Sequence, residues 1–209
     1  MNPVVLDLPF RGRWRAEMSP ARRVPSHGTE AYGSSHAIDF VAVDERGRSA
    51  PSSWRSVLAT EPPEGFLGFG AEMLAPVVGT VVATHDGEPD HEGRRSPFAL
   101  VPYALTQASR ARAGHHALAG NHVVIEITGG RVVLLAHLRC GSLRVQPGRQ
   151  VATGDVVGEC GNSGNSTEPH VHLQVSDRSD WDRAKGVPLA FRLADGVRVP
   201  REREVVRGD

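Results

Sequence analysis

The chain has 209 residues with 24 basic and 24 acidic side chains, so its formal net charge is zero and no broad attraction to nucleic acid or anionic membranes is expected. Hydrophobic residues make up 39% of the chain, enough to build a core for one domain of this length. No stretch approaches the ~20 apolar residues of a membrane span. The first 15 residues lack the apolar core of a secretory signal, which by itself predicts a cytoplasmic protein.

Strand-like segments recur along the chain and are separated by loops. Residues 1–35 predict an arm with a short strand and loops, and residues 44–70, rich in Gly, Pro and Ser, predict a long excursion beside a cleft. An insertion at 86–119 is expected to contain a short helix over 98–113, and residues 177–209 form a charged, loop-like tail. Strands are expected at residues 36–43, Val77–Thr84, Val123–Ile127, Val132–His137, Leu143–Val145, Val156–Glu159 and His170–Val175.

Many short strands with turn signals and few helices predict an all-β fold. We expect one domain over residues 1–209, with its core at about 36–175. The segment from Leu143 to Gly158 also resembles the barrel-sandwich hairpins of lipoyl-type carrier domains. A carrier needs an exposed lysine at a hairpin tip, and the only lysine, Lys185, lies outside these hairpins, which counts against a carrier module.

A Gly/Asn/Ser-rich loop at 161–166 leads into the sequence His170-Val171-His172 and an apolar run. Residues two apart in a strand point to the same face, so the two histidines are expected side by side, with their Cα atoms about 7 Å apart. Such a pair suits a metal ligand beside a proton-transfer group. The plain alternative is a pair of strand histidines that face solvent.

Two further residues favour metal chemistry. The apolar run at 132–136 leads directly to His137, and the run at 37–43 carries Asp39 in an apolar setting. A buried carboxylate without a partner is costly, and a metal ion is one such partner. Together with the histidine pair, Asp39 offers a His/Asp/His donor set that suits zinc. Cys140 and Cys160 lack the C-x-x-C spacing of a cysteine-based zinc site, and two free thiols are expected.

The order and spacing of these motifs resemble the lysostaphin-type zinc metallopeptidases, also called the LytM type, which cut peptide cross-links in bacterial cell walls. The resemblance runs from about Pro76 to Val175, with an earlier piece around His27 to Val43. It implies an antiparallel sheet folded around a groove, a peptide or peptidoglycan substrate, and a location in the cell envelope or outside the cell. The matching segments are APVVGTVV at Ala75 to Val82, GNHVVIEI followed by VVLLAHL, and GRQVATGDVVGECGNSGNSTEPHVHLQV.

The resemblance also implies roles for individual residues. Asp39 and His172 would bind Zn²⁺, while His137 and His170 would flank the attacking water, one as proton acceptor and the other as stabiliser of the oxyanion. The sequence leaves open which histidine has which role. The function that follows is a zinc-dependent endopeptidase, and the alternative is a non-catalytic relative that binds zinc or peptidoglycan.

One ligand departs from the pattern of this family, which is His-x-Gly-x-Asp. Ser35 occupies the expected histidine position, and His36 comes one residue too late. Residues three apart in a strand lie on opposite faces, so His36 would need a β-bulge to join Asp39. His27 lies in a glycine-flanked loop that is free of this constraint. We therefore predict His27 as the remaining zinc ligand and His36 as the alternate.

Overall fold

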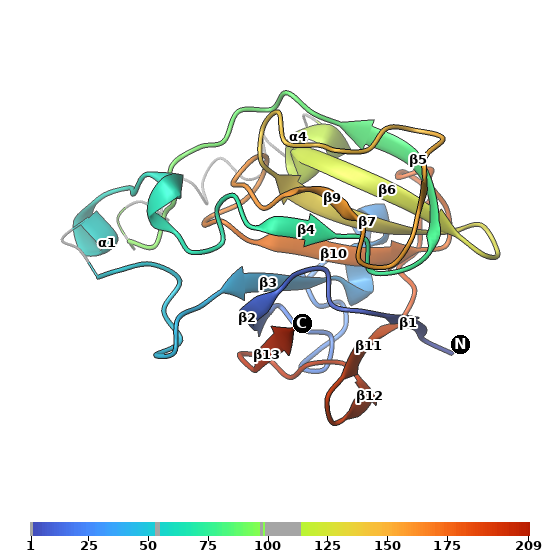
Figure 1. Cartoon of the computed structure of the whole chain (residues 1–209), viewed down its shortest axis with the longest axis horizontal. Coiled ribbons are helices and arrows are strands. Elements are labelled where there is room, and N and C mark those ends of the chain that lie inside the picture. Colours follow the sequence, from blue (N-terminus) through green and yellow to red (C-terminus); the bar gives the residue numbers. More distant parts are fainter. Residues whose placement is uncertain (1, 53–54, 97, 99–113) are drawn as a thin grey trace.

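The computed structural model describes residues 2–52, 55–96, 98 and 114–209. An eight-stranded sheet, in the order β13-β2-β3-β10-β7-β6-β5-β8, runs through its centre, and all of its strand pairs are antiparallel (Figure 1). In chain order its strands are β2 (Gly12–Glu17), β3 (Ile38–Ala42), β5 (Gly79–His85), β6 (Asn121–Ile127), β7 (Arg131–Leu138), β8 (Gln150–Val151), β10 (Val171–Ser176) and β13 (Val205–Gly208).

Two smaller sheets and four short helices complete the described part of the chain. The strands β1 (Val4–Leu6), β11 (Leu189–Leu193) and β12 (Gly196–Arg198) form one sheet, and β4 (Glu72–Leu74) pairs with β9 (Val156–Glu159) in the other. The helices are η1 (Ala31–His36), α1 (Arg55–Leu58), η2 (Pro63–Gly65) and α4 (His115–Ala119). The prediction of an all-β, antiparallel fold is confirmed, with β1 and β11 as a parallel pair. No helix among the described residues is long and apolar enough to cross a membrane.

Strand β10 shows how the sheet separates its core from its polar face. Val171, Leu173 and Val175 are fully buried in the main hydrophobic cluster. The alternate residues of the strand, from His172 onward, point to the opposite face because successive side chains in a strand alternate. On that face, a smaller apolar cluster from β6 and β7 packs against Trp181.

Several predicted boundaries were wrong. The strand expected at 36–43 begins only at Ile38, because the chain turns through the 3-10 helix η1 up to His36. No strand forms at Leu143–Val145, where a single backbone bond, from Arg144 N to Val157 O, replaces a ladder. The predicted helix at 98–113 lies outside the described residues apart from Phe98.

The expected arm and tail contribute strands to the sheets. In β2, Trp14 and Ala16 are buried and alternate with arginines, and the strand pairs with β3. The tail supplies β11, β12 and β13, so it is not loop-like. Its apolar residues 187–191 pack on the core, since Val187 and Phe191 are 2% and 0% exposed.

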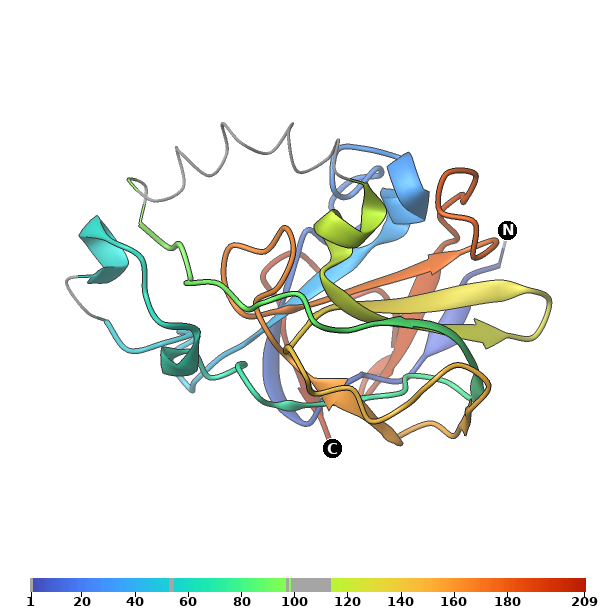
Figure 2. The same cartoon turned by 90° about the horizontal axis from the view of Figure 1, so that it is seen from above.

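Two of the expected loop excursions frame one end of the sheet. The segment at 44–70, which includes α1, projects away from the sheet in both views (Figures 1 and 2). The segment at 86–96 lies across the loop that precedes β10: Asp90 accepts a bond from the backbone N of Asn162 at 2.6 Å, and Arg94 N donates to Thr167 O at 2.6 Å.

Candidate metal centre

Strand pairing brings Asp39 and His172 together. The two residues are register partners on the antiparallel strands β3 and β10, so their side chains rise from the same face at the same level. His172 Nδ1 lies 2.9 Å from Asp39 Oδ1. Both side chains are mostly buried, with 12% and 14% of their surface exposed.

His27 reaches the same point from a loop outside the strands. Its Nε2 lies 3.1 Å from Asp39 Oδ2, and its ring centroid is 4.9 Å from that of His172. Ser26 Oγ contacts His27 Nδ1 at 3.0 Å, which leaves Nε2 to face the carboxylate. Candidate ligand atoms of His27, Asp39 and His172 all lie within 4.8 Å of one another.

His36 does not join this group. Its Nδ1 contacts the neighbouring Ser35 Oγ at 3.0 Å, and it lies at the end of η1. His36 and Asp39 do not lie in one strand, because His36 is the last residue of η1 and β3 begins at Ile38. The structure thus brings His27 beside Asp39 and His172 and leaves His36 out, while the identity of the zinc ligands stays a prediction.

The other two predicted histidines border the group. His170 Nε2 is 3.7 Å from Asp39 Oδ2, and its Nδ1 is 2.8 Å from the carbonyl O of Glu168. His137 Nδ1 donates to the carbonyl O of Ser163 at 2.9 Å. The ring centroid of His137 lies 4.7 Å from that of His170 and 5.9 Å from that of His172.

His137 adopts a backbone conformation that is unusual for its position. Its φ is +63°, in the left-handed region that a non-glycine residue rarely adopts. The next residue, Leu138, is held by two side chains, since its carbonyl O accepts bonds from Asn121 Nδ2 at 3.0 Å and from Ser163 Oγ at 2.8 Å. A conformation of this kind costs free energy, and the contacts around it must offset that cost. Sequence reasoning missed Asn121 and Ser163, and no spacing signal marked them.

The protonation states follow from burial and from the neighbouring charges. Burial alone would raise the pKa of the Asp39 carboxyl, but the positive charges of His27 and His170 and the bonds from His172 and His27 together lower it well below its usual value. Burial opposes the charged form of His172, yet the Asp39 carboxylate and Gln174 raise its pKa. Burial, followed by the charges of His170 and His172, lowers the pKa of His137 well below its usual value.

The donors of this group fit zinc. Two imidazoles and one carboxylate converge, and the carboxylate is ionised at neutral pH. A catalytic zinc site combines three such protein ligands with one open position. Cys140 and Cys160 are free thiols, and neither belongs to the group of His27, Asp39 and His172. Burial raises the pKa of the Cys160 thiol.

Part of the chain matches a known protein family. The sequence model described as peptidase family M23 matches residues 103–185, a segment that contains His137, His170 and His172. This part of the chain is similar to peptidase family M23. The resemblance to lysostaphin-type enzymes found in the motifs is thereby confirmed, while His27 and Asp39 lie before the matched segment.

Individual proteins of peptidase family M23 share limited sequence identity with this chain or match only part of it. The Peptidoglycan DD-endopeptidase ShyA of Vibrio cholerae serotype O1 is 34% identical over 107 residues, which is 51% of this chain and 23% of ShyA. The chain thus matches less than a quarter of the length of this curated relative. Similar solved structures include the M23 metalloprotease pseudoalterin (12% identity, 99% of this chain and 96% of that chain, TM-score 0.49) and the catalytic domain of lysostaphin from Staphylococcus simulans (16% identity, 76% and 80%, TM-score 0.41).

Proposed function

We propose that the chain is a zinc-dependent endopeptidase that hydrolyses peptide cross-links of peptidoglycan. The observation that carries this proposal is the convergence of His27, Asp39 and His172, bordered by His137 and His170, in a chain whose residues 103–185 match peptidase family M23. The identity of 34% to a peptidoglycan endopeptidase supports the substrate class. Such a substrate would place the protein in the cell envelope or outside the cell.

His27 Nε2, an oxygen of Asp39 and His172 Nδ1 would hold the zinc ion, because these atoms face one another. When bound there, zinc supplies a Lewis acid that polarises the scissile carbonyl and makes a water molecule acidic. The ionised carboxylate of Asp39 would supply a negative charge to a bound divalent cation.

His137 is assigned the role of proton acceptor. The carbonyl O of Ser163 can only accept a hydrogen bond, so Nδ1 of His137 carries the proton and Nε2 is the basic nitrogen. The lowered pKa of His137 keeps the ring neutral at pH 7. The ring is thus able to take a proton at Nε2 from the attacking water, as a general base must.

His170 is assigned the role of oxyanion stabiliser. The Glu168 carbonyl fixes a proton on Nδ1 of His170, which leaves Nε2 toward Asp39. When protonated, this Nε2 would donate a hydrogen bond to the carbonyl oxygen as negative charge develops on it during attack. The ring is 10% exposed, so the bond would form in a site largely shielded from water.

The test combines metal analysis with digestion of purified peptidoglycan sacculi. The zinc-loaded protein is expected to carry one zinc per chain and to release soluble fragments with new amino groups, detected by mass spectrometry. The variant His137→Ala, as the matched control, is expected to keep zinc and to release far less. Zinc-loaded protein that binds sacculi without releasing fragments would contradict the proposal and favour a non-catalytic relative.

A further inference from the structure

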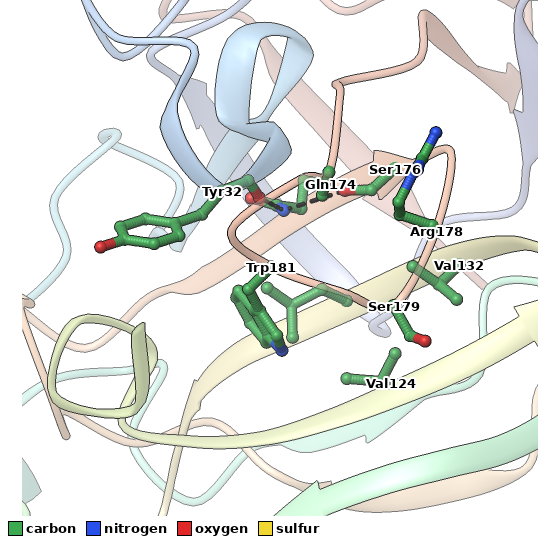
Figure 3. A pocket seen from close by; sticks show the side chains of 10 residues that line it. Tyr32, Val124, Val132, Gln174, Ser176, Arg178, Ser179 and Trp181 are labelled. Carbon is green, nitrogen blue, oxygen red and sulfur yellow. Dashed lines mark hydrogen bonds between the residues drawn. The ribbon is translucent and has the colours of Figure 1, made fainter. Parts of the chain in front are cut away.

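Gln174 lies two residues after His172 on β10, so its side chain rises from the same face of the sheet. Only 4% of the residue is exposed. Its amide contacts three polar atoms: Nε2 lies 2.7 Å from the carbonyl O of Tyr32 and 3.2 Å from Ser176 Oγ, and Oε1 lies 3.0 Å from His172 Nε2. Figure 3 shows Gln174 between Tyr32 and Ser176.

The contact with Tyr32 sets the orientation of the amide. A backbone carbonyl can only accept hydrogen bonds, so the nitrogen of the amide, not its oxygen, must face Tyr32. The amide oxygen is then turned toward His172. An amide oxygen can only accept, so Nε2 of His172 must carry a hydrogen.

This arrangement decides which nitrogen of His172 is left for a metal. With the hydrogen on Nε2, the lone pair of the neutral ring lies on Nδ1. Nδ1 is the atom that lies 2.9 Å from Asp39 Oδ1, on the side of His27. Gln174 therefore holds the ring in the tautomer, and in the orientation, that suits the group of candidate ligands.

The same amide also ties down the segment that connects the two other candidate ligands. Tyr32 lies in η1, between His27 and Asp39 in the chain, and η1 packs closely on β10. At Gly33, which has a φ of +76°, an added Cβ would meet Ser176 Oγ at 2.4 Å, so only glycine permits this approach. At the other end of η1, Ser35 O accepts a bond from Ser26 N, next to His27.

We propose that Gln174 is a positioning residue of the metal centre. It selects Nδ1 of His172 as the ligand atom and anchors the η1 segment that places His27. The inference rests on the proposed zinc site. It concerns how that site is assembled from a loop histidine, and it does not depend on the substrate.

The first test uses the wild-type protein, with ¹⁵N-labelled histidine and one equivalent of zinc. Long-range ¹H–¹⁵N spectra are expected to show His172 with a protonated Nε2 and a zinc-bound Nδ1. Zinc binding through Nε2 of His172 would overturn the inference and leave the proposed zinc enzyme intact. A wild-type protein that binds no zinc would overturn the proposed function together with the inference.

The second test compares three variants by zinc affinity, measured in competition with a chelator. Gln174→Leu loses every bond of the amide and is expected to bind zinc ~10–100-fold more weakly, the usual effect of losing such a partner. Gln174→Glu can still accept from His172 Nε2 but cannot donate to Tyr32, so the His172 tautomer should persist and affinity should recover in part. Ser176→Ala, the matched control, removes only the third bond and should stay within about twofold of wild type.

Hydrogen exchange separates the two roles of Gln174. In Gln174→Glu, backbone amides at residues 26–36 should exchange faster than in wild type, because the bond to Tyr32 O is lost. Zinc affinity of folded Gln174→Leu within about twofold of wild type would overturn the proposal. If Gln174→Leu does not fold, the Gln174→Glu variant and the wild-type spectra still test the proposal. A changed tautomer of His172 in Gln174→Glu would contradict the proposed role of the side-chain oxygen at position 174 as hydrogen-bond acceptor.

Discussion

Each carboxylate oxygen of Asp39 contacts a different histidine: Oδ1 lies 2.9 Å from His172 Nδ1, and Oδ2 lies 3.1 Å from His27 Nε2. One carboxylate thus joins a strand partner to a loop residue that lies 12 positions earlier in the chain. In the metal-free protein the negative charge of Asp39 faces both rings. With metal bound, the same atoms would face the ion.

Removal of either strand residue is expected to abolish stoichiometric zinc binding. Asp39→Ala removes the only carboxylate of the group, and His172→Ala removes one of its two imidazoles. Zinc per chain, measured after dialysis by atomic emission, should fall from about one to near zero in both variants. Full zinc content in both would show that the ion binds elsewhere.

A pair of variants tests the choice between the two histidines near the start of the chain. His27→Ala is expected to weaken zinc binding strongly, since its Nε2 faces the carboxylate. His36→Ala, the control, removes a ring whose Nδ1 contacts the neighbouring Ser35 Oγ and should leave zinc affinity near that of wild type. The opposite order of affinities would mean that the η1 turn rearranges when zinc binds.

The proposed proton acceptor is tested by metal content and rate together. His137→Ala is expected to keep about one zinc per chain, while peptide hydrolysis falls by roughly 10² or more, the scale of general acid–base groups. His170→Ala should behave in a similar way if it stabilises the oxyanion. Loss of zinc on His137→Ala would instead identify His137 as a ligand.

The buried His122 predicts a loss of stability in mild acid. Burial lowers its pKa to about 4; the bond to the Gly120 carbonyl opposes this shift, and the charges of His116, His85 and His115 add to it. Unfolded histidine titrates near 6.5, so the unfolded chain binds more protons between pH 6.5 and 4, and stability falls as the pH decreases through this window. We expect the free energy of unfolding to decrease by on the order of 3 kcal/mol across this window. Urea unfolding at several pH values would measure this decrease.

The variant His122→Phe provides the comparison for this pH effect. It keeps a ring of similar size beside Trp181 but cannot take up a proton. Its unfolding free energy should fall less steeply than that of wild type between pH 6.5 and 4, while above pH 7 the difference between the two proteins should stay constant. Equal slopes for both proteins would show that His122 is not protonated on unfolding.

Much of the sheet was predictable because its strands carry a local signal. Apolar residues in β5, β6, β7 and β10 occur in runs or alternate with polar ones, and such patterns depend only on near neighbours. One short strand was predicted within residues 1–35, without bounds, and the structure has two, β1 and β2. In β2, Trp14 and Ala16 alternate with arginines, and such charged residues hide a short apolar pattern. Strands β11 to β13 were missed because a short strand in a charged tail is defined by its partner, and partners are distant in sequence.

The all-β class, the motifs that resemble lysostaphin-type peptidases, and the candidate residues Asp39, His137, His170 and His172 were predictable from the amino-acid sequence. The folded chain was needed to show which histidine lies beside Asp39, that His36 ends a 3-10 helix, and that Gln174 links Tyr32 to His172. Each of these three features depends on the conformation of the loop between His27 and Asp39 and on which of its backbone carbonyls faces β10. Local periodicity carries no information on that placement, because a loop conformation is selected by contacts with residues more than a hundred positions away, such as Ser176 against Gly33.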